Sequence, residues 1–328
     1  MMSDAIPGAM GSRAGVAART LNGIARQLAV LPPSLLRLFA RGALRGRGVA
    51  LCLHRVGAPT RPDLLAELWS SRESIDAIIR LLRPGADGPE DTRRPHDLVL
   101  SFDDGYASAC SYVTENAARF PDVTFAAFIC PAKIERRVGF RWDLFEDQVL
   151  SGVASVGDYA EIISSSCDPL RENQRPELAG LADRAGMRLA TIDECRALAK
   201  IPNAILGNHT NAHIPFTMAR DEGWVKDLRQ SFGDFERLFG PCTHFAIPFG
   251  APWLEFTPEH IVMIRDIWEG TIWSTEPRAF RARGIEPGAL LPRFAVVGTR
   301  SPAYVAARVA LRGLLSGVRR PLQVPAGR

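Results

Sequence analysis

This sequence of 328 residues contains little lysine, few cysteines and no long apolar run. Only three of its 40 basic residues are lysines. No stretch approaches 18 uninterrupted apolar residues, which excludes a helix of the usual membrane-spanning length. The six cysteines form no CxxC pair and several lie in apolar runs, which is typical of buried thiols in a reducing compartment. No apolar core with a cleavage site follows the N-terminal arginines, so we expect no secretory signal and a cytoplasmic protein.

The formal net charge of +4 is unevenly distributed along the chain. Residues 1–47 carry seven arginines and one acid, and residues 300–328 carry six arginines and no acid, which leaves a net charge of −8 for the residues between them. An acidic body with two basic ends lacks the single basic face that a nucleic acid requires, so we expect no nucleic-acid partner. In both ends, leucines and other apolar residues are interspersed with the arginines. This mixture of apolar residues and arginines predicts helices that either pack on the domain or lie peripherally on the anionic inner membrane.

Residues 48–298 alternate short apolar runs, rich in β-forming residues, with amphipathic segments. This alternation predicts an α/β protein with a parallel sheet, and about seven strands in 250 residues favour a distorted (β/α) barrel, similar to a TIM barrel. Residues 140–190 interrupt the alternation and are interpreted as a helical insertion and candidate lid. We therefore expect a basic N-terminal extension over 1–47, partly helical or disordered, and a basic C-terminal helix and tail over 299–328.

Two polar motifs follow predicted strands: Ser101-Phe102-Asp103-Asp104-Gly105 and His209-Thr210-Asn211-Ala212-His213. The C-terminal ends of parallel barrel strands share one mouth, so we expect the motifs to meet. Histidines four apart can bind one metal ion together with a carboxylate, and a second carboxylate can accept a proton from a bound water. Each motif has an alternative interpretation. A lone HxxxH is more often structural, and Asp-Asp-Gly after a strand is usually a turn.

Taken together, SFDDG, HTNAH and FAIPFG resemble the polysaccharide deacetylase family (carbohydrate esterase family 4, the NodB homology domain). LCLHRV at 51–56 and LPR at 291–293 resemble its branch associated with exopolysaccharide synthesis. The resemblance covers about residues 48–298, without the insertion. It implies a distorted barrel of fewer than eight strands and removal of N-acetyl groups from N-acetylhexosamine units of an envelope or exopolysaccharide precursor. It also implies a divalent metal, with zinc as the first choice and cobalt or nickel as alternatives.

The same resemblance implies roles for individual residues. Asp104, His209 and His213 would be the metal ligands, and Asp103 would be the base for a metal-bound water that attacks the acetyl carbonyl. The backbone N–H of Phe249 would help to hold the oxyanion, while Pro248 fixes the loop.

This sequence departs from the family pattern at two places. Ala246 stands where many members have an arginine that pairs with the base, and Leu291-Pro292-Arg293 stands where many have a general-acid histidine. We predict that Arg293 supplies the missing positive charge beside Asp103. His54 is predicted to donate a proton or bind the sugar, with a hydrogen-bonded core histidine as the alternative.

Three tryptophans are candidates for contact with a sugar ring. Trp253 and Trp273 lie near the expected mouth, whereas Trp142 either stacks on a sugar or anchors a helix. Two other functions remain open because of the missing arginine and histidine: a non-catalytic sugar-binding protein of deacetylase ancestry, or an O-deacetylase.

Overall fold

The computed structural model describes residues 13–83, 97–159, 173–218, 223–281, 285 and 288–316. The extreme N-terminus, the middle of the predicted insertion and the C-terminal tail lie outside these residues, so the predictions for them stay predictions.

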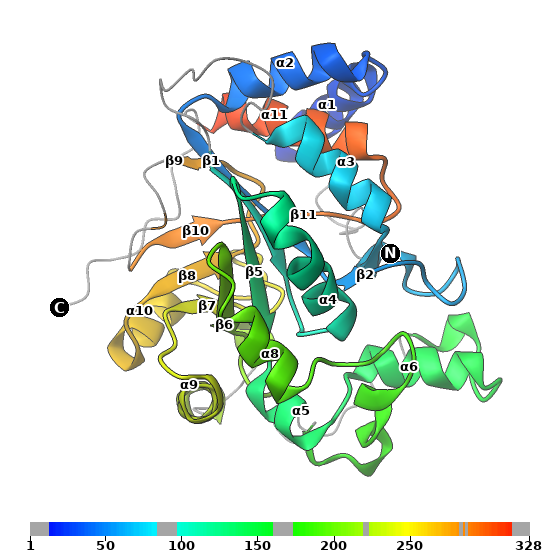
Figure 1. Cartoon of the computed structure of the whole chain (residues 1–328), viewed down its shortest axis with the longest axis vertical. Coiled ribbons are helices and arrows are strands. Elements are labelled where there is room, and N and C mark those ends of the chain that lie inside the picture. Colours follow the sequence, from blue (N-terminus) through cyan, green and yellow to red (C-terminus); the bar gives the residue numbers. More distant parts are fainter. Residues whose placement is uncertain are drawn as a thin grey trace.

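Six parallel strands form most of a curved sheet (Figure 1). They are β1 (Arg47–Leu53), β4 (Asp97–Phe102), β5 (Val123–Ile129), β6 (Ala204–Asn208), β7 (His244–Ala246) and β8 (Thr271–Ser274). Short strands β2 (Arg55–Val56) and β3 (Trp69–Ser70) form a separate parallel pair, and β9 (Phe280–Arg281) pairs antiparallel with the start of β1. The strands are apolar and buried on both faces, as expected for a parallel sheet covered by helices.

One short segment closes this sheet into a barrel. β10 (Leu290–Pro292) pairs parallel with β8, and β11 (Phe294–Ala295) pairs parallel with β1. Only Arg293 separates these two strands, so the same piece of chain borders both edges of the sheet. The result is a distorted barrel with seven parallel strand positions, which confirms the predicted fold class.

Side chains of described residues fill the barrel interior, as is usual in barrels of this kind. A compact cluster of small and aromatic residues occupies the inside: Ala50, Val99, Ala126, Phe128, Ala246, Trp273 and Leu291. The much larger core lies between the outer faces of the strands and the surrounding helices.

The helices that cover the barrel begin and end largely where the sequence patterns indicate. They are α3 (Arg72–Leu82), α4 (Ala107–Asn116), α5 (Pro131–Arg136), α6 (Arg141–Leu150), α8 (Ile192–Leu198), α9 (Gly223–Phe239), α10 (Pro258–Ile267) and α11 (Pro302–Leu315). Ser71 caps α3 by accepting a hydrogen bond from the N–H of Ser74 at 3.1 Å. Thr191 and Glu194 form a capping box on α8.

Two N-terminal helices and α11 form a layer at one end of the molecule, next to α3 and the start of β1 (Figure 1). The N-terminal pair comprises α1 (Arg13–Leu28) and α2 (Pro33–Leu44). Leu36 and Leu44 of α2 are fully buried in this layer, whereas Leu35 and Leu38 are exposed. Within the described residues, no helix combines the length and the apolarity needed to cross a bilayer.

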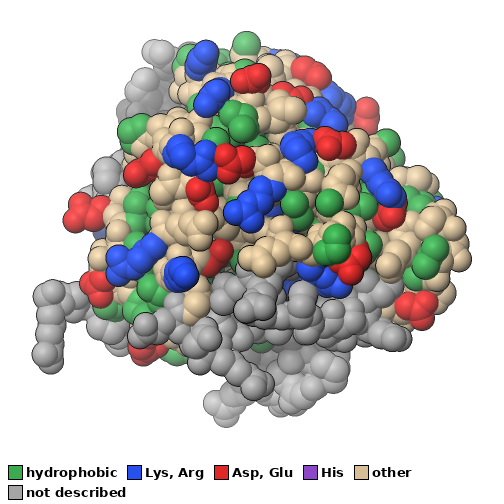
Figure 2. All heavy atoms as spheres, turned by 90° about the horizontal axis from the view of Figure 1, so that it is seen from below, with side chains coloured by type: hydrophobic (Ala, Val, Ile, Leu, Met, Phe, Trp, Pro, Cys, Tyr) green, Lys and Arg blue, Asp and Glu red, His purple; other side chains and the backbone are tan. Residues whose placement is uncertain are grey.

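The opposite face of the molecule, seen from below in Figure 2, carries basic and acidic side chains next to each other over its described part. This mixture provides no continuous basic surface on the described part of that face.

Candidate active site

The predicted metal ligands, the predicted base and Phe249 follow strands at the C-terminal end of the barrel. Asp103 and Asp104 follow β4, and His209 to His213 follow β6. Phe249 lies in the turn after β7. The backbone of this region is unusual, because five of its non-glycine residues have positive φ: Asp104 (73°), Thr210 (63°), His213 (52°), Phe249 (58°) and Trp253 (67°). Such conformations are unfavourable and concentrate at functional sites, where the surrounding fold holds them in place.

Asp104, His209 and His213 converge at this end of the barrel. Each of these three residues offers one potential ligand atom, and the three atoms lie within 4.8 Å of one another. All three residues are buried. Nε2 of His213 is 3.0 Å from Oδ1 of Asp104, and Nε2 of His209 is 3.8 Å from the same oxygen. Two imidazoles and one carboxylate are a common ligand set for a catalytic zinc ion.

The tautomer of His209 is fixed by the backbone. Its Nδ1 lies 2.8 Å from the carbonyl oxygen of Ala246, which can only accept a hydrogen bond, so Nδ1 carries the proton. The lone pair of Nε2 is therefore available on the side of Asp104. Burial lowers the pKa of His209 to about 4, which keeps the ring neutral at neutral pH. A neutral imidazole oriented through its second nitrogen is the form that binds a metal.

Asp104 is also suited to a cation. Burial by itself raises the pKa of this carboxyl, but His213 and its other histidine neighbours outweigh that effect and lower the pKa below its usual range. Its Oδ1 is buried and makes no well-formed hydrogen bond to any described residue, although His213 lies nearby. A metal ion would stabilise a buried, ionised carboxylate oxygen that lacks a hydrogen-bond donor. The three residues therefore fit a divalent cation.

Arg293 forms a buried, bidentate ion pair with Asp103. Nη1 of Arg293 donates to Oδ1 at 2.6 Å, and Nη2 donates to Oδ2 at 3.0 Å. The guanidinium also donates to the hydroxyl of Ser101 at 3.0 Å and lies over the ring of Phe128. Burial alone raises the pKa of Asp103, but Arg293 and His209 outweigh it and lower the pKa below its usual range. The structure thus places a positive charge beside Asp103, where the sequence analysis expected one from Arg293.

His54 and Cys52 border Asp103 on its other side. Their potential ligand atoms and a carboxylate oxygen of Asp103 also lie within 4.8 Å of one another, and His54 is only partly buried. The Cys52 thiol donates to Oδ2 of Asp103 at 3.3 Å. A cation at this second trio would meet the guanidinium of Arg293, which already neutralises Asp103. The trio of Asp104 and the two motif histidines is therefore the better metal site.

Aromatic rings surround His213. Phe140, Trp142 and Phe249 have ring centroids 5.4, 5.1 and 5.0 Å from its ring. Phe249 is 39% exposed and Pro248 before it is buried.

The two tryptophans expected near the mouth differ in position. Trp253 is 69% exposed, so its ring is accessible to a ligand. Trp273 is fully buried inside the barrel, where its ring packs against Phe128 and its Nε1 donates to Nδ1 of His244 at 3.3 Å. An enclosed ring offers no face to a sugar, so this position corrects the expectation of substrate contact for Trp273.

A second buried polar cluster was missed by the sequence analysis. Arg55 pairs with Asp143 and Glu146 of α6, and all three side chains are buried. The hydroxyl of Tyr106 donates to Asp143 at 2.8 Å and accepts from Nε1 of Trp142 at 2.7 Å. The cluster fixes the start of the predicted insertion to the segment after Asp104, and it places Trp142 beside His213. The sequence offered two weak signals for this cluster: two acids three apart in the predicted helical insertion, and an arginine within an apolar run.

This cluster predicts a pH-dependent stability. Burial raises the pKa of Asp143 to about 6, above its value in an unfolded chain. The stabilisation from protonated Asp143 is fully present below about pH 4 and is lost as the pH rises through about 6, with an upper limit of about 3 kcal/mol. Urea unfolding between pH 4.5 and 7.5 should show this loss in the wild type and a flatter profile in Asp143→Asn. Asp193→Asn, at an exposed position in α8, is the matched control and should retain the wild-type slope.

Comparison with solved structures finds similar folds. A polysaccharide deacetylase from Bacillus cereus has a TM-score of 0.51 at 12% identity, covering 81% of this chain and 69% of that chain. IcaB from Ammonifex degensii has a TM-score of 0.50 at 14% identity, and the match covers 81% of this chain and 97% of that chain. No family model and no curated protein matches the sequence. The chain therefore has the fold of the polysaccharide deacetylases, as the resemblance of its motifs implies.

Proposed function

We propose that this protein is a metal-dependent deacetylase of acetylated carbohydrates. The observation that carries the proposal is the convergence of Asp104, His209 and His213 beside a second carboxylate, Asp103, which is paired with Arg293. The residues that the motifs assign to a metal and to a base thus lie together at one end of the barrel, within a fold shared with polysaccharide deacetylases.

The metal ion would be held by Asp104, His209 and His213. When bound, it would supply a Lewis acid and lower the pKa of a water molecule. Asp103 is an ionised carboxylate at neutral pH because of Arg293, so it can accept the proton of the attacking water. The bidentate contact with Arg293 also fixes the orientation of Asp103. The backbone N–H of Phe249 is proposed to donate to the oxyanion, and His54 to protonate the leaving amine.

We propose an N-acetylhexosamine unit of an envelope or exopolysaccharide precursor as the substrate, with zinc as the metal. The ring of Phe249 contacts His213 and is partly exposed, and Trp253 is exposed four residues further along the chain, so both rings suit the apolar face of a sugar ring. Pro248, which is buried next to Phe249, is proposed to fix the loop. The cytoplasmic location stays a prediction.

The test combines acetate release with detection of a new primary amine on chitooligosaccharides. We expect both products in the presence of zinc and neither after chelation. Asp103→Asn should lower kcat by about 10²–10⁴-fold, because a general base contributes about that much. Asp193→Asn is the control that removes an acid elsewhere, and it should leave kcat unchanged.

The other two candidate functions give different results in this assay. Acetate release from acetyl esters without a new amine would indicate an O-deacetylase. Sugar binding without acetate release at any metal concentration would contradict the enzymatic proposal and leave a sugar-binding protein.

We further propose that the layer of α1, α2 and α11 contacts an anionic membrane surface. Residues 13–47 contain seven arginines and no acid, and Leu38 (67%) and Val30 (83%) are exposed in this layer.

Flotation with phosphatidylserine vesicles should carry the protein upward at low salt and less at high salt, whereas neutral vesicles should not. Leu38→Glu should weaken binding, and Val153→Glu, at an exposed residue after α6, should not. Equal behaviour of both vesicle types would refute the proposal.

A further inference from the structure

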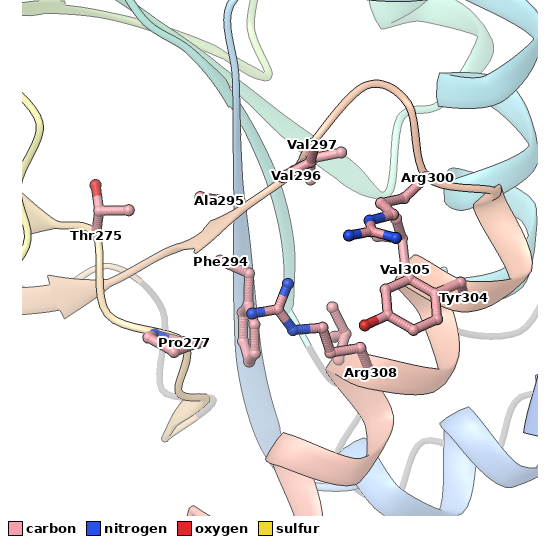
Figure 3. Close-up of a pocket in the computed structure, with 11 residues that line it drawn as sticks. Thr275, Pro277, Phe294, Ala295, Val296, Val297, Arg300, Tyr304, Val305 and Arg308 are labelled. Atoms are coloured by element: carbon pink, nitrogen blue, oxygen red, sulfur yellow. The ribbon is translucent and has the colours of Figure 1, made fainter. Parts of the chain in front are cut away.

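A small pocket of about 110 Å³ lies outside the barrel, between α11, β11 and the loop that follows β8 (Figure 3). Its walls are partly apolar, with Phe294, Val296 and Val305 among the lining residues. Ligand pockets for drug-sized molecules measure about 300–1,000 Å³. This pocket therefore has room for one small chemical group and not for a whole sugar.

The polar groups of the pocket come mainly from one face of the last helix. Arg300, Tyr304 and Arg308 are spaced four residues apart, which aligns them along α11 and the residues just before it. Figure 3 shows both guanidinium groups and the Tyr304 hydroxyl directed toward the space in front of β11, with Thr275 on the far side. Arg300 also lies over the Tyr304 ring, at 5.7 Å from its centroid.

Charge in this pocket is of one sign. The lining residues include two arginines and no acid. Glu276, between the lining residues Thr275 and Pro277, is paired with Arg278 at 3.3 Å. Two arginine side chains on one side of a small pocket favour an anionic ligand over a cationic one.

Arg308 has hydrogen-bonding capacity that the described protein leaves unused. Its Nε is buried and has no hydrogen-bond partner in the described part of the chain. A buried donor without an acceptor is unfavourable, so an acceptor from outside the described residues would stabilise this group.

We propose that this pocket binds a phosphate group through Arg300, Arg308 and the hydroxyl of Tyr304. The fork of N–H donors in arginine matches the geometry of phosphate oxygens, and the hydrogen bonds are strengthened by the charges. The pocket lies behind the active site, because Arg293 contacts Asp103 inside the barrel and the next residue, Phe294, lines the pocket outside it. The inference goes beyond the proposed function and does not depend on it.

Titration calorimetry with inorganic phosphate, at constant ionic strength, tests the proposal. We expect one saturable site in the wild-type chain. Arg308→Gln should weaken it at least tenfold, because hydrogen bonds to charged groups are among the strongest in proteins. Arg229→Gln is the matched control: it removes one positive charge from an exposed position on α9, and it should bind phosphate as the wild type does.

Two further measurements keep the result decisive. Tyr304→Phe removes only a hydroxyl and should weaken phosphate binding several-fold, even if Arg308→Gln does not fold. A hexose 1-phosphate distinguishes the two sources of the phosphate group. If it binds more tightly than inorganic phosphate, the pocket is assigned to a phosphorylated ligand. If the two bind equally, the pocket is assigned to the free ion. Absence of saturable binding, or equal losses in Arg308→Gln and Arg229→Gln, overturns the proposal.

Discussion

Replacing His209 with alanine is expected to abolish stoichiometric binding of a divalent ion and to reduce kcat/KM at least about 10³-fold. His209 supplies a neutral, oriented imidazole to a cluster of only three potential ligands, so its loss leaves Asp104 and His213. A metal acting as a Lewis acid contributes several kcal/mol to stabilisation of the transition state, and each 1.36 kcal/mol corresponds to tenfold in rate. Metal content by plasma emission spectroscopy and acetate release measure the two effects.

The control for this variant is His260→Ala. His260 lies in α10, where it contacts Trp224 and caps its own helix, away from the cluster. We expect one ion per chain in the wild type and in His260→Ala. An unchanged ion content in His209→Ala would remove the metal site, and with it the proposed deacetylase, from consideration.

Replacing Arg293 with methionine is expected to destabilise the fold by about 3–5 kcal/mol. The substitution leaves the carboxylate of Asp103 buried without its partner, and breaking one half of a buried ion pair has about this effect. The free energy of unfolding in urea measures the loss. Activity should fall as well, because Asp103 loses the contact that orients it.

The chain offers a matched comparison for Arg293. Arg83 and Asp122 form a similar bidentate pair on the surface, with N–O distances of 3.0 and 2.9 Å. Arg83→Met should lower the free energy of unfolding by no more than about 1 kcal/mol, because exposed ion pairs contribute little. In an Asp103→Asn background, Arg293→Met should be less harmful than in the wild type, since no charge is then left unpaired. Equal effects in both backgrounds would contradict a coupled pair.

The metal trio could be predicted because its residues are local to two motifs. Asp103-Asp104 and the histidines of HTNAH each follow an apolar run, and the ends of parallel strands meet at one mouth of a barrel. The spacing within each motif and this rule predicted that the motifs meet, and the resemblance to the polysaccharide deacetylases separated Asp104 as a ligand from Asp103 as the base. The positive φ values of Asp104, Thr210 and His213 were not predictable, because non-glycine residues carry no signal for them.

The position of Trp273 and the cluster around Arg55 show where pattern reasoning fails. Trp273 lies in an apolar strand, and a strand of a parallel barrel is buried on both faces, so the pattern does not reveal which side chains point inward. Arg55, Tyr106 and Asp143 come from three separate segments. Nothing in any one segment identifies a buried ion pair, because its formation depends on the other two.

The sequence by itself determined the class of fold, the set of candidate metal ligands and the base beside them, because these depend on local periodicity and on motifs of a few residues. Only the tertiary structure decided how the barrel closes and with what geometry Arg293, the partner proposed from the sequence, meets Asp103. Arg293 is separated from Asp103 by 190 positions, and it reaches the carboxylate because residues 290–295 pair with β8 on one side and β1 on the other. The geometry of a contact of that range depends on strand pairing across the whole domain, and no local pattern encodes that geometry.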